Sequence, residues 1–223
     1  MKRTVLAQRK LPSYTRGEEQ MNMITHIVGG GLSVLGMVLL LLRAAAGANP
    51  WCIAASALYG CSLIAVFTVS SVYHGLTPSY AKKVMQVVDH CTIYFLIAGS
   101  YTVILLGDLR TVYPEIAWGL FVFQWSCAAL AAIFTAIDLK RYSVFSMICY
   151  IGMGWSVIPF WRQVLEVMTA PGFWLLLAGG IAYSVGSILY GLGKKRKWMH
   201  SIFHIFVNLG ALLQYLSIIL YVI

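Results

Sequence analysis

All five histidines of the chain lie in or at the end of long apolar runs, where ionisable side chains are costly: His26, His74, His90, His200 and His204. His200 and His204 are four residues apart, so on a helix they share one face and can bind one metal ion together. A polar pair that only packs within a helix bundle would explain the same spacing. With His74 at the same membrane depth, three neutral imidazoles become available. Three imidazoles favour a zinc site that keeps a fourth position for water.

Two further polar residues are candidates for chemistry beside these histidines. Ser70 precedes His74 by four residues, so its hydroxyl could bond a metal-bound water, a substrate carbonyl or its own helix backbone. Asp89 is the one acidic residue inside an apolar run, and we expect it to orient and deprotonate a zinc-bound water. Pairing with Lys82 or Lys83 would also account for this carboxylate.

The other two histidines fit the metal site less well. Asp89 and His90 are adjacent and therefore about 100° apart around a helix, so both side chains are not expected to face one metal. We leave His90 out of the ligand set. His26 is expected to cap or bond neighbouring helices rather than to bind the metal.

The helices that must hold these residues are visible in the hydropathy. The chain has 223 residues, of which 60% are hydrophobic and 10% charged, and its mean hydropathy of +0.81 excludes a water-soluble fold. A hydrocarbon core of about 30 Å needs roughly 20 apolar residues per helix. Seven runs of that size follow: 24–42, 51–74, 84–106, 116–137, 142–161, 173–192 and 198–223. The sequence therefore predicts an all-α integral membrane protein, with a basic tail at 1–23 and seven transmembrane helices within 24–223.

Basic residues give the expected orientation of these helices. Thirteen of the sixteen Lys and Arg lie in the tail and in three alternate loops, around 82–83, 140–141 and 194–197. The other side holds only Arg43, Arg110 and Arg162, so the N-terminus is predicted to be cytoplasmic and the C-terminus outside. The same placement assigns the net charge of +9 to topology and lipid headgroups, not to nucleic acid. All five histidines then lie near the cytoplasmic face.

Four motifs together resemble the hemolysin III family, the bacterial branch of the progestin and adipoQ receptors, in a superfamily that includes alkaline ceramidases. They are ExxNxxTH (Glu19, Asn22, Thr25, His26), SxxxH (Ser70, His74), Asp89 with His90 in VVDHCTIYFLIAGSYT, and HSIFHIFVNLG (His200, His204). The resemblance covers essentially the whole chain after the tail. It implies a seven-helix protein with its N-terminus inside.

The resemblance also implies roles for single residues. Zinc would be held by His74, His200 and His204, with Asp89 near the zinc water and Ser70 one turn before the first ligand; Glu19, Asn22, Thr25, His26 and His90 would be accessory. The chain departs from the family pattern in three places: Val103 follows Thr102 where proline is usual, and Asn208 and Gln214 stand at positions that are usually less polar or histidine.

A zinc-dependent hydrolase of a lipid-like amide or ester, active in membrane homeostasis, is the first functional hypothesis. A lipid-sensing, receptor-like or regulatory protein with structural zinc is the second. A pore is disfavoured, because no ionisable residue is expected in the outer half of the bilayer. A retinal protein is excluded, since the last apolar run holds no lysine. The expected location is the cell membrane, as a multi-pass protein of a bacterial inner membrane, and membrane lipids and a small lipid-like ligand are the expected partners.

Overall fold

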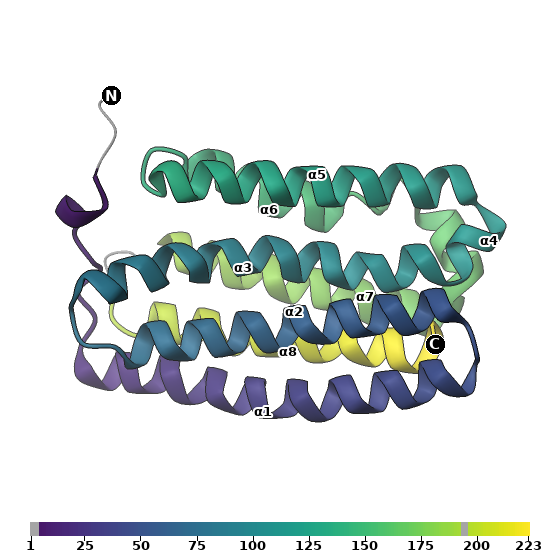
Figure 1. The fold of residues 1–223 in the computed structure, drawn as a ribbon, viewed down its shortest axis with the longest axis horizontal. Coiled ribbons are helices and arrows are strands. Elements are labelled where there is room, and N and C mark those ends of the chain that lie inside the picture. The colour runs from purple at the N-terminus through teal and green to yellow at the C-terminus, as the bar shows by residue number, and fades with distance from the viewer. Residues whose placement is uncertain (1–4, 193–195) are drawn as a thin grey trace.

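A computed structural model describes residues 5–192 and 196–223, and in these ranges the regular elements are all helical (Figure 1). Lys194 and Lys195, part of the basic loop used for orientation, lie outside the described residues. The elements are a 3-10 turn Leu6–Gln8, α1 Arg16–Ala46, α2 Pro50–Gly75, α3 Tyr80–Ile104, a π-helical turn Leu105–Leu109, α4 Arg110–Val112, α5 Pro114–Asp138, α6 Ser143–Trp155, a 3-10 turn Ile158–Phe160, α7 Trp161–Leu192 and α8 Met199–Tyr221.

Local sequence signals explain where the helices begin. Thr15 caps α1 through a capping box with Glu18, which starts this helix well before the apolar run at 24–42. Asn49 caps α2 and is followed by Pro50, and Ser79 caps α3. The polar first turns of α1 and α3 therefore belong to the same regular helices as the apolar runs that follow them.

Within residues 5–192 and 196–223, six stretches of helix, rather than the expected seven, are long and apolar enough to cross a membrane. The predicted runs 142–161 and 173–192 share one helical stretch of 50 residues, 143–192, which accounts for the lower number. A straight helix of that length would extend about 75 Å, more than twice the hydrocarbon core. The stretch is interrupted by the 3-10 turn at Ile158–Phe160 and again at Thr169, where φ is 67°. The expected runs 142–161 and 173–192 lie to either side of Thr169.

Helix α3 runs through the centre of the bundle. It packs against α2 on one side and α5 on the other, while α1 packs against α2 and α8, and α7 lies along α8. The backbones of α7 and α8 come close together at Gly179, where an added Cβ would stand 3.0 Å from the carbonyl oxygen of Gly210. Val103, which replaces the usual proline, lies fully buried in α3 just before the π-helical turn.

The starts of α1, α3 and α8 and the end of α2 meet at one end of the bundle, next to the N-terminal segment (Figure 1). These are the four helix ends that carry the histidines.

Candidate metal centre

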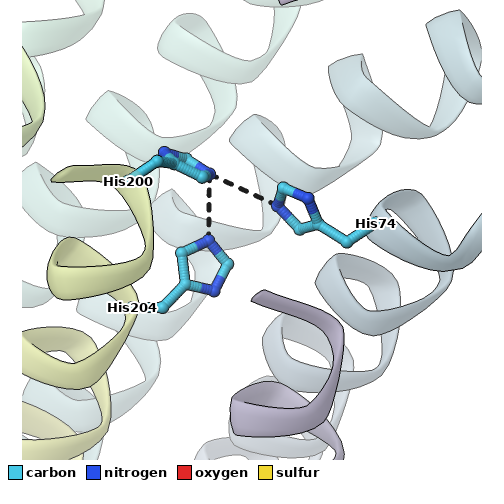
Figure 2. A group of neighbouring side chains, drawn as sticks. All are labelled: His74, His200 and His204. Atoms are coloured by element: carbon cyan, nitrogen blue, oxygen red, sulfur yellow. Dashed lines mark hydrogen bonds between the residues drawn. The ribbon is translucent and has the colours of Figure 1, made fainter. Parts of the chain in front are cut away.

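Three histidine side chains converge between α2 and α8. The Nε2 atom of His200 lies 3.3 Å from Nε2 of His74 and 3.0 Å from Nε2 of His204 (Figure 2). All three ligand atoms lie within 4.8 Å of one another. His74 and His204 are 3% and 2% exposed, and His200 is half-buried, so most of the cluster is shielded from water. This buried group could hold a metal ion.

The donor set fits zinc. Nitrogen ligands of one tetrahedral zinc, at about 2.0–2.1 Å from the metal, stand roughly 3.3 Å apart. The Nε2 separations of 3.3 Å and 3.0 Å are close to this value. Three neutral imidazoles that all present a lone pair through Nε2 must each carry their proton on Nδ1. The hydrogen-bond partners of the Nδ1 atoms therefore decide how strongly each ring is held in the tautomer that binds metal through Nε2.

Of these Nδ1 atoms, that of His74 has a charged partner. It lies 2.6 Å from Oε2 of Glu19 in α1, and the other carboxylate oxygen accepts a 2.7 Å hydrogen bond from Nζ of Lys82 in α3. Lys82 is 3% exposed and also donates to the carbonyl oxygen of Leu76. One ionic chain thus joins α1, α2 and α3 behind the first candidate ligand.

The same nitrogen has a second neighbour, the side-chain amide of Asn22. Nδ2 of Asn22 lies 3.5 Å from Nδ1 of His74, and Oδ1 of Asn22 accepts a 2.7 Å hydrogen bond from Ser201 in α8. By contrast, Nδ1 of His200 and Nδ1 of His204 have no hydrogen-bond partner within residues 5–192 and 196–223.

The N-terminal segment packs over the cluster. The ring of Tyr14 stacks on His200, with centroids 4.8 Å apart and planes inclined by 16°. Burial raises the pKa of the Tyr14 phenol, so the ring stays neutral. Next to it, Oε1 of Glu18 accepts a 2.6 Å hydrogen bond from the backbone N–H of Trp198, which has φ of 66°. This bond holds the start of α8 against the start of α1.

The remaining sequence-predicted residues lie around the cluster without joining it. The ring of His26 contacts the ring of His204 at a centroid distance of 3.8 Å with the planes tilted by 32°, and in the described chain neither of its ring nitrogens has a hydrogen-bond partner. Nδ1 of His90 donates to the carbonyl oxygen of Gln86, one turn earlier in α3. Thr25 donates to carbonyl oxygens of its own helix.

A cavity of about 160 Å³ extends from the cluster into the apolar interior. Ser70, Asp89, His200 and His204 line its polar part, and apolar side chains such as those of Ile93, Leu96, Ile97 and Val207 line much of the rest. The cavity therefore joins the candidate metal ligands to a space suited to a hydrocarbon chain. Gln214, one of the departures from the family pattern, also lines it.

Asp89 does not form the lysine pair that was considered for it. Lys82 is bonded to Glu19, and Nζ of Lys83 donates to the carbonyl oxygen of Ala7. The nearest cationic candidate is Nδ1 of His90, at 3.9 Å from the carboxylate. Asp89 thus lines the cavity beside Ser70 and, in the described chain, forms no ion pair with a lysine.

Sequence reasoning missed Tyr14, Lys82 and Ser201 as parts of this centre. The apolar runs place Lys82 in a cytoplasmic loop. Helical spacing gives the missing signal, because Lys82, Gln86 and His90 follow each other at intervals of four residues and so share one helix face. Tyr14 precedes the first helix, where no periodicity exists to place it.

Comparisons with known proteins show the family to which the chain is similar. A family model described as "Haemolysin-III related" matches residues 14–215. The chain is 36% identical to hemolysin-3 of Bacillus cereus over 92% of both chains, and 35% identical to a hemolysin-3 homolog of Bacillus subtilis (strain 168) over 93% of this chain and 96% of that one. It is 30% identical to the human monocyte to macrophage differentiation factor, over 72% of this chain and 67% of that protein. No solved structure matches the chain.

Proposed function

The chain belongs to the haemolysin-III-related family, and we propose that it is a zinc-dependent membrane hydrolase that acts on a lipid-like amide or ester. Family membership and six apolar helical stretches make it a multi-pass integral membrane protein. The observation that carries the proposal is the continuity of the histidine cluster with a largely apolar cavity that also contains Asp89 and Ser70.

The proposed topology has seven crossings, with the N-terminus in the cytosol and the C-terminus outside. The break between α6 and α7 supports two crossings within residues 143–192. The basic residues support the orientation, because Lys82, Lys83, Lys140 and Arg141 lie at helix ends on the side of the cluster. The histidines would then lie just inside the cytoplasmic leaflet.

His74, His200 and His204 would hold the metal through Nε2. Zinc bound there would lower the pKa of a coordinated water toward ~7 and act as a Lewis acid. Asp89 would accept the proton that the attacking water loses, because it is a carboxylate on the wall of the same cavity. Ser70 would hydrogen-bond the substrate carbonyl and hold it in place.

The cavity supports an amphiphilic substrate. Its polar end would receive the scissile amide or ester, and its apolar part would exclude water and accommodate an acyl chain. Turnover of such a lipid would connect the protein to membrane homeostasis.

The test is to incubate purified, zinc-loaded protein with ceramides, other acyl amides and phospholipids, and to measure released fatty acid by mass spectrometry. We expect release from at least one class, which the Asp89→Asn variant reduces while it keeps its zinc. Intact lipids across the whole panel, with zinc bound, would refute the hydrolase.

The coverage of the cluster by Tyr14 favours one second candidate, a lipid-sensing regulatory protein in which zinc ties α2 to α8. In that case Asp89→Asn would leave cellular function unchanged, whereas loss of zinc would abolish it.

A further inference from the structure

We propose that Glu19 is a positioning residue that holds the His74 imidazole in its metal-binding tautomer, against the competing amide of Asn22. The inference concerns the same metal centre as the proposed function. It rests on the contacts of one ring nitrogen, and it is testable through zinc affinity without any substrate.

A neutral imidazole binds metal through the nitrogen that lacks a proton. Nε2 of His74 is the atom that faces His200, so the metal-binding form carries its proton on Nδ1. A carboxylate can only accept a hydrogen bond, and Oε2 of Glu19 lies 2.6 Å from Nδ1. Glu19 therefore stabilises the Nδ1–H tautomer.

Asn22 acts in the opposite direction. Ser201 donates to Oδ1 of Asn22, which leaves the amide nitrogen facing Nδ1 of His74 at 3.5 Å. An amide N–H can only donate, so it would stabilise a deprotonated Nδ1 and place the ring proton on Nε2. Asn22 is 0% exposed, so bulk water does not compete with its amide for Nδ1 of His74. The shorter contact with a charged acceptor is the stronger of the two.

Lys82 explains how a carboxylate can remain at this position. Glu19 is only 20% exposed in its side chain, and its Oε1 accepts a 2.7 Å hydrogen bond from the ammonium group of Lys82. The pair keeps Glu19 ionised and directs its second oxygen at His74. Nδ1 of His200 and Nδ1 of His204 have no such partner in the described chain. Of the three candidate ligands, His74 is therefore the one whose metal-binding tautomer is fixed before the metal binds.

The experiment measures zinc affinity of the full-length protein in detergent by competition with a chromophoric chelator. We expect Glu19→Ala to weaken zinc binding by about 10- to 100-fold, the usual effect of removing the outer partner of a metal-ligating histidine. Glu19→Gln should lie between Glu19→Ala and wild type, because its amide oxygen can still accept from Nδ1. Glu166→Ala, an exposed glutamate at the far end of the bundle, is the matched control and should have no effect.

A rescue separates tautomer control from general damage. Glu19→Ala combined with Asn22→Asp supplies a new carboxylate beside Nδ1, and it should recover most of the lost affinity. Nitrogen NMR of the zinc-free protein should show the His74 proton shift from Nδ1 toward Nε2 in Glu19→Ala and return in the double variant. Circular dichroism of each variant establishes that the helices are intact.

Equal zinc affinity in wild type and Glu19→Ala, or a double variant no better than Glu19→Ala, would overturn this inference and leave the hydrolase proposal standing. Absence of zinc binding in the wild type would overturn both. Zinc binding with the expected rescue, but without lipid hydrolysis, would support the role of Glu19 and refute only the enzyme.

Discussion

The two ends of the bundle use polar residues in opposite ways. At the histidine end, Asn22, His74 and Lys82 are almost completely buried and are linked across α1, α2, α3 and α8. At the other end the buried side chains include Leu40, Ala44, Leu109 and Ala117.

The contacts of charged side chains at the far end lie on the surface. Nε of Arg43 donates to the carbonyl oxygen of Ile223, and the Tyr113 hydroxyl donates to Glu166, both in exposed positions. Exposed contacts of this kind contribute little to stability, whereas burial of apolar side chains contributes more. The histidine end thus differs from the far end in holding a buried polar network that links four helices around the candidate metal centre.

The largest expected effect comes from removing the ligands. A His200→Ala/His204→Ala double variant should lose its zinc entirely, from one ion per chain to none, because a single imidazole cannot hold the metal. Metal analysis of the purified protein measures this. His90→Ala is the control, since His90 is bonded to its own helix, and it should keep the zinc. Zinc retained in the double variant would place the metal elsewhere.

The next effect separates chemistry from metal binding. Asp89→Asn should lower hydrolysis by about 10²- to 10⁴-fold, the range for loss of a general base, with zinc content unchanged. Asp108→Asn, at the exposed far end, should leave the rate as it is. If the two variants hydrolyse lipid equally fast, Asp89 has no part in the reaction.

Two adjacent lysines offer a closely matched pair. Lys82→Met should weaken zinc binding by about 10-fold and lower the melting temperature, because it leaves the Glu19 carboxylate without its cation. Lys83→Met removes the same charge from a side chain that bonds Ala7 at an exposed position, and should do neither. Chelator competition and thermal unfolding give both readouts. Equal behaviour of the two variants would show that the charge alone, not the link to Glu19, matters.

The smallest effect is expected at the far end. Tyr113→Phe removes an exposed hydrogen bond to Glu166 and should change neither the melting temperature nor the zinc affinity. A clearly lower melting temperature would mean that exposed polar contacts at the far end also contribute to stability, contrary to the difference between the two ends.

Periodicity and helix geometry predicted much of this molecule. The i, i+4 spacing puts His200 and His204 on one face, and hydropathy located the apolar helical stretches but divided residues 143–192 into two spans where the described structure has one stretch. Periodicity could not predict the hydrogen bonds between distant segments, because Glu19 and His74 are 55 positions apart and Lys82 and Glu19 are 63 apart. Hydropathy left a gap at 162–172, and the break at Thr169 lies in it, but hydropathy could not give the helical structure on either side of that residue.

Helix α6 has a consequence for the surrounding lipid. Its 13 residues extend about 20 Å, well short of a hydrocarbon core of about 30 Å. A bilayer meets such a mismatch by thinning locally, which draws the phosphate and glycerol layer inward on that flank. Met147, Tyr150 and Ile151 of α6 line the cavity, so in the proposed topology a bilayer thinned beside this helix would border the cavity wall. Membrane thickness would then act on the wall of the cavity through this helix.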